Sequence, residues 1–367
     1  MRRRATSSKN VTLIDIADAL QISTSTVHRA LYEGGSVRAV TRARVRQMAT
    51  KLGYRPNLAA RFLKSNRHFT ISVNTLKGTT SFWDEVRAGI AEEAGVLPLN
   101  NVTLEYRTYP GLGKGEQEAF QQALAAKVDG IIMFPTRPAR IAHSVRRARQ
   151  SNVPVICVAT DAPQTERLAV VSVDTMVSGS LAADLIGKLA RGSSKVAVTL
   201  SDLAITEHAE KCDAFARTLQ RYYPRIRLAA TIQDHDVESE AYDKARKLFR
   251  TCPDLRGIYI TTEASIPVLN AAKDAHMLDR LTIITTDLFP ALVQWIRSGA
   301  VEATIYQRPK TQGMLAFRIL HEYLTEGKCP TPQVRLAPHL VTRGNLDFFL
   351  QRQSQESDHD ERVAAFP

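Results

Sequence analysis

The chain has 367 residues, of which 44% are hydrophobic and 23% are charged. This composition is typical of a globular protein and excludes collagen-like, disulfide-scaffold and disordered chains. No apolar run approaches the roughly 18 residues of a membrane span, and the basic start lacks the apolar core of a secretory signal. Four scattered cysteines form no C-x-x-C pair. We therefore expect a cytoplasmic protein without cofactor or metal site.

The positive charge is concentrated near the N-terminus. Residues 1–68 contain 14 Lys and Arg against three acidic residues, so they carry +11 of the total net charge of +12. A basic module on a nearly neutral body indicates a polyanionic partner, and the phosphate backbone of a nucleic acid is the usual one. A solvated basic tail is the alternative, but this segment has regular helical patterning instead of low complexity.

Three short helices are predicted in this basic segment. Each follows a side chain that can accept a hydrogen bond from the first helical amides, and apolar residues then recur at helical spacing. The expected caps are Thr12, Ser23 and Thr41, and the second helix is expected over Thr24 to about Tyr32. Two helices joined by a tight turn and followed by a third are typical of a helix-turn-helix module.

From Phe69 onward the pattern changes to short β-branched runs that alternate with amphipathic helical stretches. This alternation predicts parallel sheets with helical crossovers, and about 280 residues favour two doubly wound lobes over one sheet. The expected strands are Thr70–Leu76, Val102–Tyr109, Asp129–Phe134, Val153–Ala159, Ala169–Val173, Lys195–Leu200, Arg227–Ile232, Gly257–Thr261, Leu281–Thr286 and Glu302–Tyr306. Helices are expected at Phe82–Ala94, Lys114–Ala126, Ser178–Ala190, His208–Tyr222 and Glu238–Arg250. Ligands of such folds bind at the carboxyl ends of strands.

A family resemblance is carried by Val11-Thr12-Leu13-x-Asp15-Ile16-Ala17, Ile22-Ser23-x-x-Thr26-Val27-x-Arg29-Ala30-Leu31, Thr41-Arg42-x-x-Val45, Leu52-Gly53-Tyr54-x-Pro56-Asn57 and Ala60-Arg61-x-Leu63. This pattern resembles the lactose-repressor/galactose-repressor (LacI/GalR) family of transcriptional regulators over about residues 11–65. Residues 69–345 are more loosely similar to the sugar-binding core of that family and of periplasmic pentose-binding proteins. The similar pieces are Ser81-Phe82-Trp83, Gly130-Ile131-Ile132-x-x-Pro135, Val153-Pro154-Val155-Ile156, Asp161-Ala162-Pro163, Asp287 and Ala303-Thr304-Ile305-Tyr306-Gln307.

The resemblance implies that the second helix lies in the major groove of DNA. Its base-reading positions fall on Thr24, Ser25, His28 and Arg29. Arg29 is suited to a bidentate contact with guanine, although a lone arginine is more often a solvated surface residue. The target sequence does not follow from the small Thr24 and Ser25.

The segment Asn57–Ser65 corresponds to the hinge helix of that family. It is too short to be helical alone in water, and the resemblance implies that it folds with a second copy in the minor groove. Asn57, Ala60 and Leu63 are then DNA-binding residues, with Leu63 inserted between base pairs. The alternative is that Leu63 packs between domains.

The resemblance also implies an effector site at the strand ends of the core. Sugar sites need flat apolar faces and fixed polar acceptors. The expected effector-binding residues are Phe82, Trp83, Phe134, Asp161, His208, Glu263, Asp287 and Gln307. Many relatives have an arginine at about Ala209 and an Asn-Asp pair where Thr262-Glu263 stands here. Because the acidic anchors remain and this cation is missing, we expect a neutral sugar, polyol or cyclitol.

These observations predict a sequence-specific DNA-binding transcriptional regulator, a repressor, that acts as a homodimer on a near-palindromic operator. The alternatives are an activator or co-repressor-dependent regulator, a non-catalytic sugar-binding protein and an enzyme. The N-terminal module counts against a transport protein. No G-x-S-x-G, Walker, HExxH or Rossmann motif supports an enzyme. The C-terminal tail lacks the leucine heptads of a coiled-coil tetramer.

The expected domain order is a basic tail, the helix-turn-helix domain, a hinge, a two-lobed core and a C-terminal tail. In that order, the segments are residues 1–10, 11–56, 57–68, 69–345 and 346–367. Within the core, we expect the first lobe over about 69–160 and 289–325. The second lobe is expected over about 161–288 and 326–345.

Overall fold

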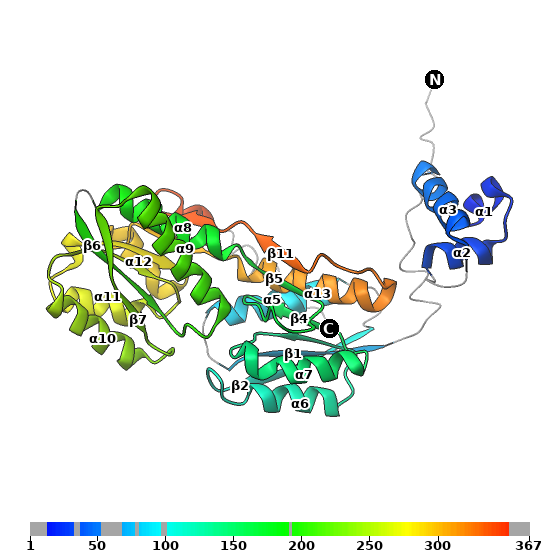
Figure 1. The fold of residues 1–367 in the computed structure, drawn as a ribbon, viewed down its shortest axis with the longest axis horizontal. Coiled ribbons are helices and arrows are strands. Elements are labelled where there is room, and N and C mark those ends of the chain that lie inside the picture. The colour runs from blue at the N-terminus through cyan, green and yellow to red at the C-terminus, as the bar shows by residue number, and fades with distance from the viewer. Residues whose placement is uncertain are drawn as a thin grey trace, which may run out of the picture. The chain divides into compact units, whose positions relative to one another are not determined.

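The computed structural model describes residues 13–32, 37–52, 68–77, 81–96, 101–190 and 193–351 (Figure 1). The chain divides into two units, which are described separately: Met1–His68 with Glu322–Cys329, and Phe69–His321 with Pro330–Pro367. Within the described ranges, no helix combines the length and the hydropathy that crossing a bilayer requires.

The first unit contains the three predicted helices, α1 (Leu13–Leu20), α2 (Thr24–Tyr32) and α3 (Ala39–Leu52). One face of each helix contributes to a small apolar core that contains Ile16, Ala17, Val27, Ala30, Val45 and Ala49. This packing is what stabilises helices of 8 to 14 residues, because such short helices are marginal in isolation.

Two of the three predicted helix caps can be compared with the structure. The Ser23 hydroxyl accepts a hydrogen bond from the Thr26 amide at 3.2 Å, which confirms Ser23 as the cap of α2. The prediction for Thr41 is wrong, because α3 begins two residues earlier, at Ala39. Thr12 lies outside the described residues.

The second unit contains two six-stranded sheets. We call the sheet with order β11-β5-β4-β3-β1-β2, together with its helices, the first lobe, and the sheet with order β12-β10-β9-β8-β6-β7 the second lobe. The strands are β1 (Phe69–Leu76), β2 (Val102–Tyr109), β3 (Gly130–Met133), β4 (Val155–Val158), β5 (Ala169–Val173), β6 (Ser194–Leu200), β7 (Ile226–Gln233), β8 (Leu255–Ile260), β9 (Thr282–Thr286), β10 (Ala303–Tyr306), β11 (Gln333–Leu336) and β12 (His339–Val341). Among these strands only β12 pairs antiparallel, with β10. The predicted α/β fold class with parallel sheets is confirmed, and the ends of the ten predicted strands agree within two residues.

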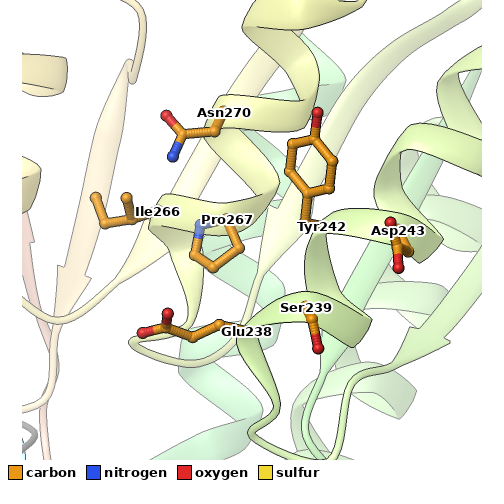
Figure 2. A pocket seen from close by; sticks show the side chains of 7 residues that line it. All are labelled: Glu238, Ser239, Tyr242, Asp243, Ile266, Pro267 and Asn270. Atoms are coloured by element: carbon orange, nitrogen blue, oxygen red, sulfur yellow. The ribbon is translucent and has the colours of Figure 1, made fainter.

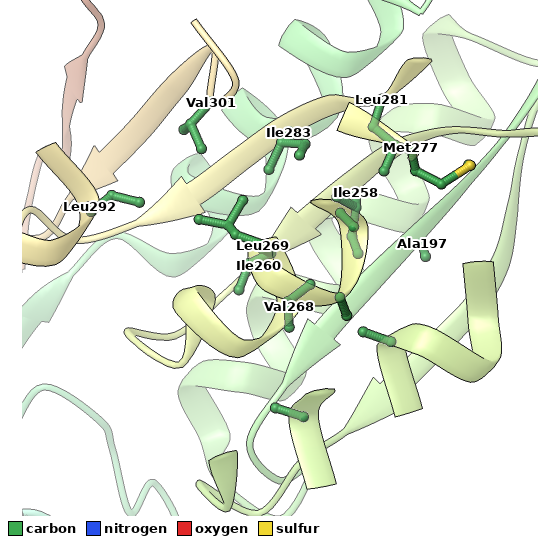
Figure 3. Close-up of a cluster of buried hydrophobic side chains, with 14 of the residues drawn as sticks. Ala197, Ile258, Ile260, Val268, Leu269, Met277, Leu281, Ile283, Leu292 and Val301 are labelled. Atoms are coloured by element: carbon green, nitrogen blue, oxygen red, sulfur yellow. The ribbon is translucent and has the colours of Figure 1, made fainter. Parts of the chain in front are cut away.

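Helices cover both sheets. They are α5 (Ser81–Gly95), α6 (Glu116–Ala125), α7 (Pro138–Gln150), α8 (Thr175–Leu189), α9 (Thr206–Tyr222), α10 (Glu238–Thr251), α11 (Ser265–Asp274), α12 (Pro290–Ser298) and α13 (Pro309–Glu326), with a short 3-10 turn η1 (Leu278–Arg280). In the second lobe, α10, α11 and α12 pack on one face of the sheet and α8 and α9 on the other. Figure 3 shows part of the first of these two apolar layers, with Ile258, Ile283 and Leu269 at its centre.

The chain passes between the two sheets after β5, after β10 and after β11. The expected lobe boundaries are therefore wrong for three strands, because β5 and β11 belong to the first lobe and β10 to the second. β5 pairs with β4 through Ile156 and Ala169, and β10 pairs with β9 through Ala303 and Ile284. Strand pairing is a long-range choice, and the local pattern of a short β-branched run does not show which neighbour it will join.

The expected C-terminal tail also differs from the structure. Residues 346–351 are helical, and Leu346 is 1% exposed within the apolar layer of the second lobe. The core therefore extends beyond residue 345. Residues 352–367 lie outside the described residues.

A close crossing of α8 and α9 depends on Gly179. A Cβ atom at this position would lie 2.2 Å from the backbone oxygen of Lys211, which is too close for any side chain. Gly179 thus lets α8 approach the turn of α9 that carries Lys211. This contact fixes α9 beside the carboxyl ends of the second sheet.

Candidate functional site

The exposed face of α2 contains all four residues that were predicted to contact bases. Thr24, Ser25, His28 and Arg29 are exposed, whereas the intervening Val27 is fully buried in the small helical core. This division follows from the helical period, since positions separated by three or four residues share one face. Their role in DNA recognition stays a prediction.

Side-chain contacts order the first turn of α2. The Ser23 hydroxyl lies 2.9 Å from the Ser25 hydroxyl and 2.8 Å from that of Thr26. One turn later, the Arg29 Nε donates to the Ser25 carbonyl at 3.4 Å. Arg29 therefore extends along the exposed face of α2. The predicted hinge residues Asn57, Ala60 and Leu63 lie outside the described residues.

In the core, the structure brings the three predicted aromatic residues together in the first lobe. Phe82 and Trp83 are in the first turn of α5, and Phe134 directly follows β3. The Trp83 ring lies 4.9 Å from that of Phe82 and 4.4 Å from that of Phe134, between ring centroids. Edge-to-face and tilted contacts of this kind are favourable, and all three rings are buried, with 8% or less of each residue exposed. We call Phe82, Trp83 and Phe134 the aromatic wall.

Asp161 was expected to bind an effector, but in the structure its carboxylate binds an arginine. It is 2% exposed, and both of its carboxylate oxygens bind Arg167, with 2.7 Å between Oδ2 and Nη2. Arg167 also donates to the Pro332 carbonyl at 2.9 Å. The charge of Asp161 is thus neutralised inside the first lobe, by a partner that the sequence analysis did not consider. A sugar hydroxyl would have to compete with this arginine.

The second lobe places Asp287 and Gln307 side by side at the ends of β9 and β10. The Gln307 side-chain Nε2 donates to Asp287 Oδ2 at 2.7 Å, and the Gln307 amide donates to Oδ1 at 3.2 Å. Both residues are 5% exposed. The predicted pair is therefore in contact, although the structure does not test its role in effector binding.

A buried cation extends this pair into a network. The Lys211 ammonium is fully buried and donates to Gln307 Oε1 at 2.8 Å and to Glu207 Oε1 at 2.5 Å. Because Lys211 binds the oxygen of the Gln307 amide, the nitrogen of that amide must face Asp287. We call Glu207, Lys211, Gln307 and Asp287 the charged network. The inference from Ala209 that this wall lacks a cation is corrected by Lys211, whose charge is already paired with that of Glu207.

Burial changes the protonation of the network. It raises the pKa of Asp287 to about 8, although the nearby Lys211 charge opposes this shift. A carboxyl with such a pKa keeps its proton at neutral pH and can donate a hydrogen bond. Burial alone would lower the pKa of Lys211, but the Glu207 carboxylate together with Tyr259 and Asp287 raises it, so the net shift is upward.

His208 and Glu263, the remaining predicted effector residues, already have protein partners. His208 is 7% exposed, and its Nδ1 accepts a hydrogen bond from the Asp202 amide at 3.4 Å. Burial lowers the pKa of His208, which favours this neutral, accepting form. The Glu263 carboxylate reaches the first lobe, where it accepts from the Ser81 amide at 3.1 Å.

Sequence reasoning missed Lys211, Glu207 and Arg137. The first two are four residues apart on α9, a spacing that is typical of solvated pairs on helix surfaces, so the sequence held no signal for their burial. Arg137 follows β3 by four residues and binds Asp202 of the second lobe at 2.6 Å. Its position just beyond a strand end could have identified it.

A groove separate from these residues lies between α10 and α11 (Figure 2). Its volume is about 320 Å³, and none of the predicted site residues line it. The lining residues are Glu238, Ser239, Tyr242, Asp243, Ile266, Pro267 and Asn270. Within the described residues, no cluster of His, Cys, Asp and Glu has the arrangement of a metal site.

Comparison with known proteins agrees with this architecture. Residues 12–57 match the model of "Bacterial regulatory proteins, lacI family", and residues 71–329 match that of a periplasmic binding protein domain. The N-terminal module belongs to the LacI family of bacterial regulatory proteins, and the core belongs to the periplasmic binding protein domain family. The regulator thus combines a DNA-binding module with a two-lobed α/β core, as its sequence predicted.

The curated relatives share this organisation along their length. Catabolite control protein A of Staphylococcus epidermidis is 24% identical to the regulator over 341 residues, which cover 91% of this chain and 98% of that protein. The protein of the same name from Staphylococcus xylosus is 23% identical over 338 residues, with the same coverage.

Solved structures of sugar-binding proteins resemble the core. GanP, a glucose-galactose binding protein from Geobacillus stearothermophilus, has a TM-score of 0.71 and 24% identity, and the match covers 76% of this chain and 99% of that one. A solute-binding protein from Burkholderia graminis, solved with D-arabinose, has a TM-score of 0.71 and 21% identity, covering 76% and 97%. At this identity the likeness establishes the fold of the core.

Proposed function

We propose that this LacI-family transcriptional regulator binds a near-palindromic operator as a homodimer, with the first turns of α2 in the major groove. The observation that carries the proposal is the exposed face formed by Thr24, Ser25, His28 and Arg29, in a segment that holds nearly all of the net positive charge. Phosphate contacts provide affinity, whereas base contacts on one short helix specify only a half-site. Two copies then specify a complete operator.

We further propose that a small neutral carbohydrate-like effector binds between the aromatic wall and the charged network. A flat apolar surface on one side and fixed donors and acceptors on the other are the two requirements of a sugar site. Among the expected residues, Phe82, Trp83, Phe134, Asp287 and Gln307 provide them. We place Asp161 and His208 as supports of this site, because both are engaged with neighbouring protein groups.

The sign of the response that we propose is induction, in which the effector releases DNA. Closing or opening the two lobes around a ligand would change the spacing of the hinge segments of a dimer, which by family resemblance contact the minor groove through Asn57, Ala60 and Leu63. DNA must then weaken effector binding by the same factor, because linkage is reciprocal. Activation or co-repression is the opposite outcome of the same measurement.

The DNA proposal is tested with Arg29→Ala. An operator is first selected from a library of randomised palindromes, and its affinity is compared with that of a random duplex at two salt concentrations. Loss of one bidentate contact should remove about 1–3 kcal/mol of discrimination while the salt-dependent affinity for any duplex persists. An unchanged ratio of operator to random affinity would show that Arg29 does not contact bases.

The effector proposal is tested by thermal unfolding of the full chain with a fixed panel. The panel contains D-glucose, D-galactose, D-arabinose, D-ribose and myo-inositol, with D-gluconate and D-glucose 6-phosphate as anionic counterparts. A neutral member should raise the melting temperature, since a ligand of the folded state stabilises it by mass action, and should then lower operator affinity. Stabilisation by the anionic members alone would contradict the proposed effector class.

A further inference from the structure

Two acidic side chains of the second lobe contact the first lobe directly. Glu263, which follows β8, accepts hydrogen bonds from the backbone amides of Ser81 at 3.1 Å and Phe82 at 3.5 Å. Asp202, which follows β6, accepts from Arg137 Nη2 at 2.6 Å. The two contacts arise from different strands of each sheet, so they fasten the lobes at two separate points.

The contact of Glu263 has a clear electrostatic basis. The first amides of a helix have no partner within the helix, and the helix dipole adds partial positive charge there. The amides of Ser81 and Phe82 begin α5, and the acceptor comes from a residue 182 positions further along the chain. A carboxylate in this position stabilises the start of α5 only while the lobes are together.

Neighbouring groups position both Asp202 and its partner Arg137 for their contact. Its Oδ1 accepts from the Ala204 amide at 2.8 Å, which directs Oδ2 toward Arg137. The side chains of Arg137 and Asp202 are only 22% and 12% exposed. Opposite them, Gly113 makes room, since a Cβ at this residue would lie 3.2 Å from the Cγ and Nε of Arg137. Burial alone would raise the pKa of Asp202, but the Ala204 amide and Arg137 lower it.

Glu263 also stands beside the proposed effector site. The amides that it binds belong to the turn of α5 that carries Phe82 and Trp83 of the aromatic wall. A molecule that stacks on this wall and bonds the start of α5 must displace the carboxylate. The protein therefore places its own anionic group where part of an effector would bind.

We propose that Glu263 and Asp202 form an interlobe clasp that holds the two lobes together and that an effector must displace Glu263 from α5. The clasp itself stands on the contacts above, and only its displacement by effector rests on the proposed function. Its regulatory consequence is a threshold: the effector's binding free energy must exceed the cost of releasing Glu263.

The clasp is tested by hydrogen–deuterium exchange on the full chain without any effector. The readout is the exchange rate of the peptide that contains the amides of Ser81 and Phe82. Variants Glu263→Ala and Asp202→Asn are compared with Asp254→Asn, which removes an exposed ion pair with Lys195 in the same lobe. Glu263→Ala should raise the exchange rate at the start of α5 by about tenfold. Asp202→Asn, which loses the charge but keeps one oxygen acceptor, should raise it by less, and the control should not raise it.

Asp202→Asn is the decisive variant because its side chain bonds Arg137 and Ala204, whereas the readout is at α5. If only Glu263→Ala raises exchange there, Glu263 is a local helix cap and the clasp is overturned. Equal increases in the Asp254→Asn control would overturn it as well. Should Glu263→Ala fail to fold, Glu263→Gln takes its place, with a smaller increase expected because it keeps an oxygen acceptor. Since no effector is used, failure of every sugar to bind would contradict the proposed function and leave this result intact.

Discussion

The two lobes provide the candidate cleft with unlike surfaces. The first lobe contributes three packed rings, Phe82, Trp83 and Phe134, whose contacts are apolar. The second contributes Lys211, Asp287 and their partners, fully or almost fully buried and bonded to one another. Burial is favourable for apolar side chains, whereas a buried charged group is tolerated only while it keeps its hydrogen-bonding or ionic partner. Substitutions in the aromatic wall should therefore act locally, whereas single substitutions in the charged network should disturb the whole network.

The largest expected effect comes from removing the buried cation. Lys211→Met leaves the Glu207 carboxylate and the Gln307 amide oxygen without their donor. We expect the free energy of unfolding, measured by urea denaturation, to fall by about 3–5 kcal/mol.

The matched control is Lys188→Met on α8. Lys188 pairs with Asp184 at the same four-residue spacing, but its side chain is 64% exposed, so its loss should cost less than about 1 kcal/mol. Similar losses in both variants would mean that burial does not distinguish the charged network. A double variant Glu207→Leu, Lys211→Met should recover part of the loss, since no unpaired charge remains.

The next effect concerns the buried ion pair of the first lobe. Asp161→Asn removes the negative charge that the Nε and Nη2 groups of Arg167 bind. We expect about 2–3 kcal/mol lower stability in the same urea experiment, as for hydrogen bonds to charged groups. A variant with unchanged stability but much weaker effector binding would restore Asp161 to the effector site and contradict its role as a support.

The smallest expected effect is on the way folding stability depends on pH. Because burial raises the pKa of Asp287 to about 8, the folded state holds a proton that the unfolded chain releases above about pH 4. Folding stability therefore falls as pH rises between these values. Burial also raises the pKa values of Asp234 and Glu302 to about 7, so these groups contribute with the same sign.

Asp287→Asn isolates the part that belongs to the charged network. Asn is suited to the left-handed backbone at this position, where φ is 67°. Between pH 6.5 and 8, the unfolding free energy of the variant should decline less steeply with pH than that of the native protein, by up to about 1.4 kcal/mol per pH unit. Equal slopes for the two proteins would show that Asp287 ionises normally.

The effector affinity of the Asp287→Asn variant should fall about tenfold, or about 1.4 kcal/mol, in calorimetry with any sugar that the panel identifies.

Much of the fold followed from local pattern. The helical spacing of Val27 and Ala30 predicted which face of α2 is buried, and the apolar run Ala169–Val173 predicted β5. Assignment of β5 to the correct sheet did not follow, because its pairing with β4 is a long-range contact. The site shows the same limit. The strand-end positions of Asp287 and Gln307 were predicted, but nothing local to Asp161 indicated that Arg167 would bind it.

Local sequence was enough to predict the periodicities, the Ser23 cap, the charge imbalance and the family pattern, because each depends on residues within one or two turns or strands. Tertiary structure decided the burial of Lys211, the sheet membership of β5 and β10, and the bond from Glu263 to α5 across 182 residues of chain. By their spacing alone, Glu207 and Lys211 are typical of a surface pair, and the close packing of α8 on α9 at Gly179 contributes to their burial. Burial raises the free-energy cost of leaving a charge without its partner, and burial depends on the packed chain rather than on the local sequence.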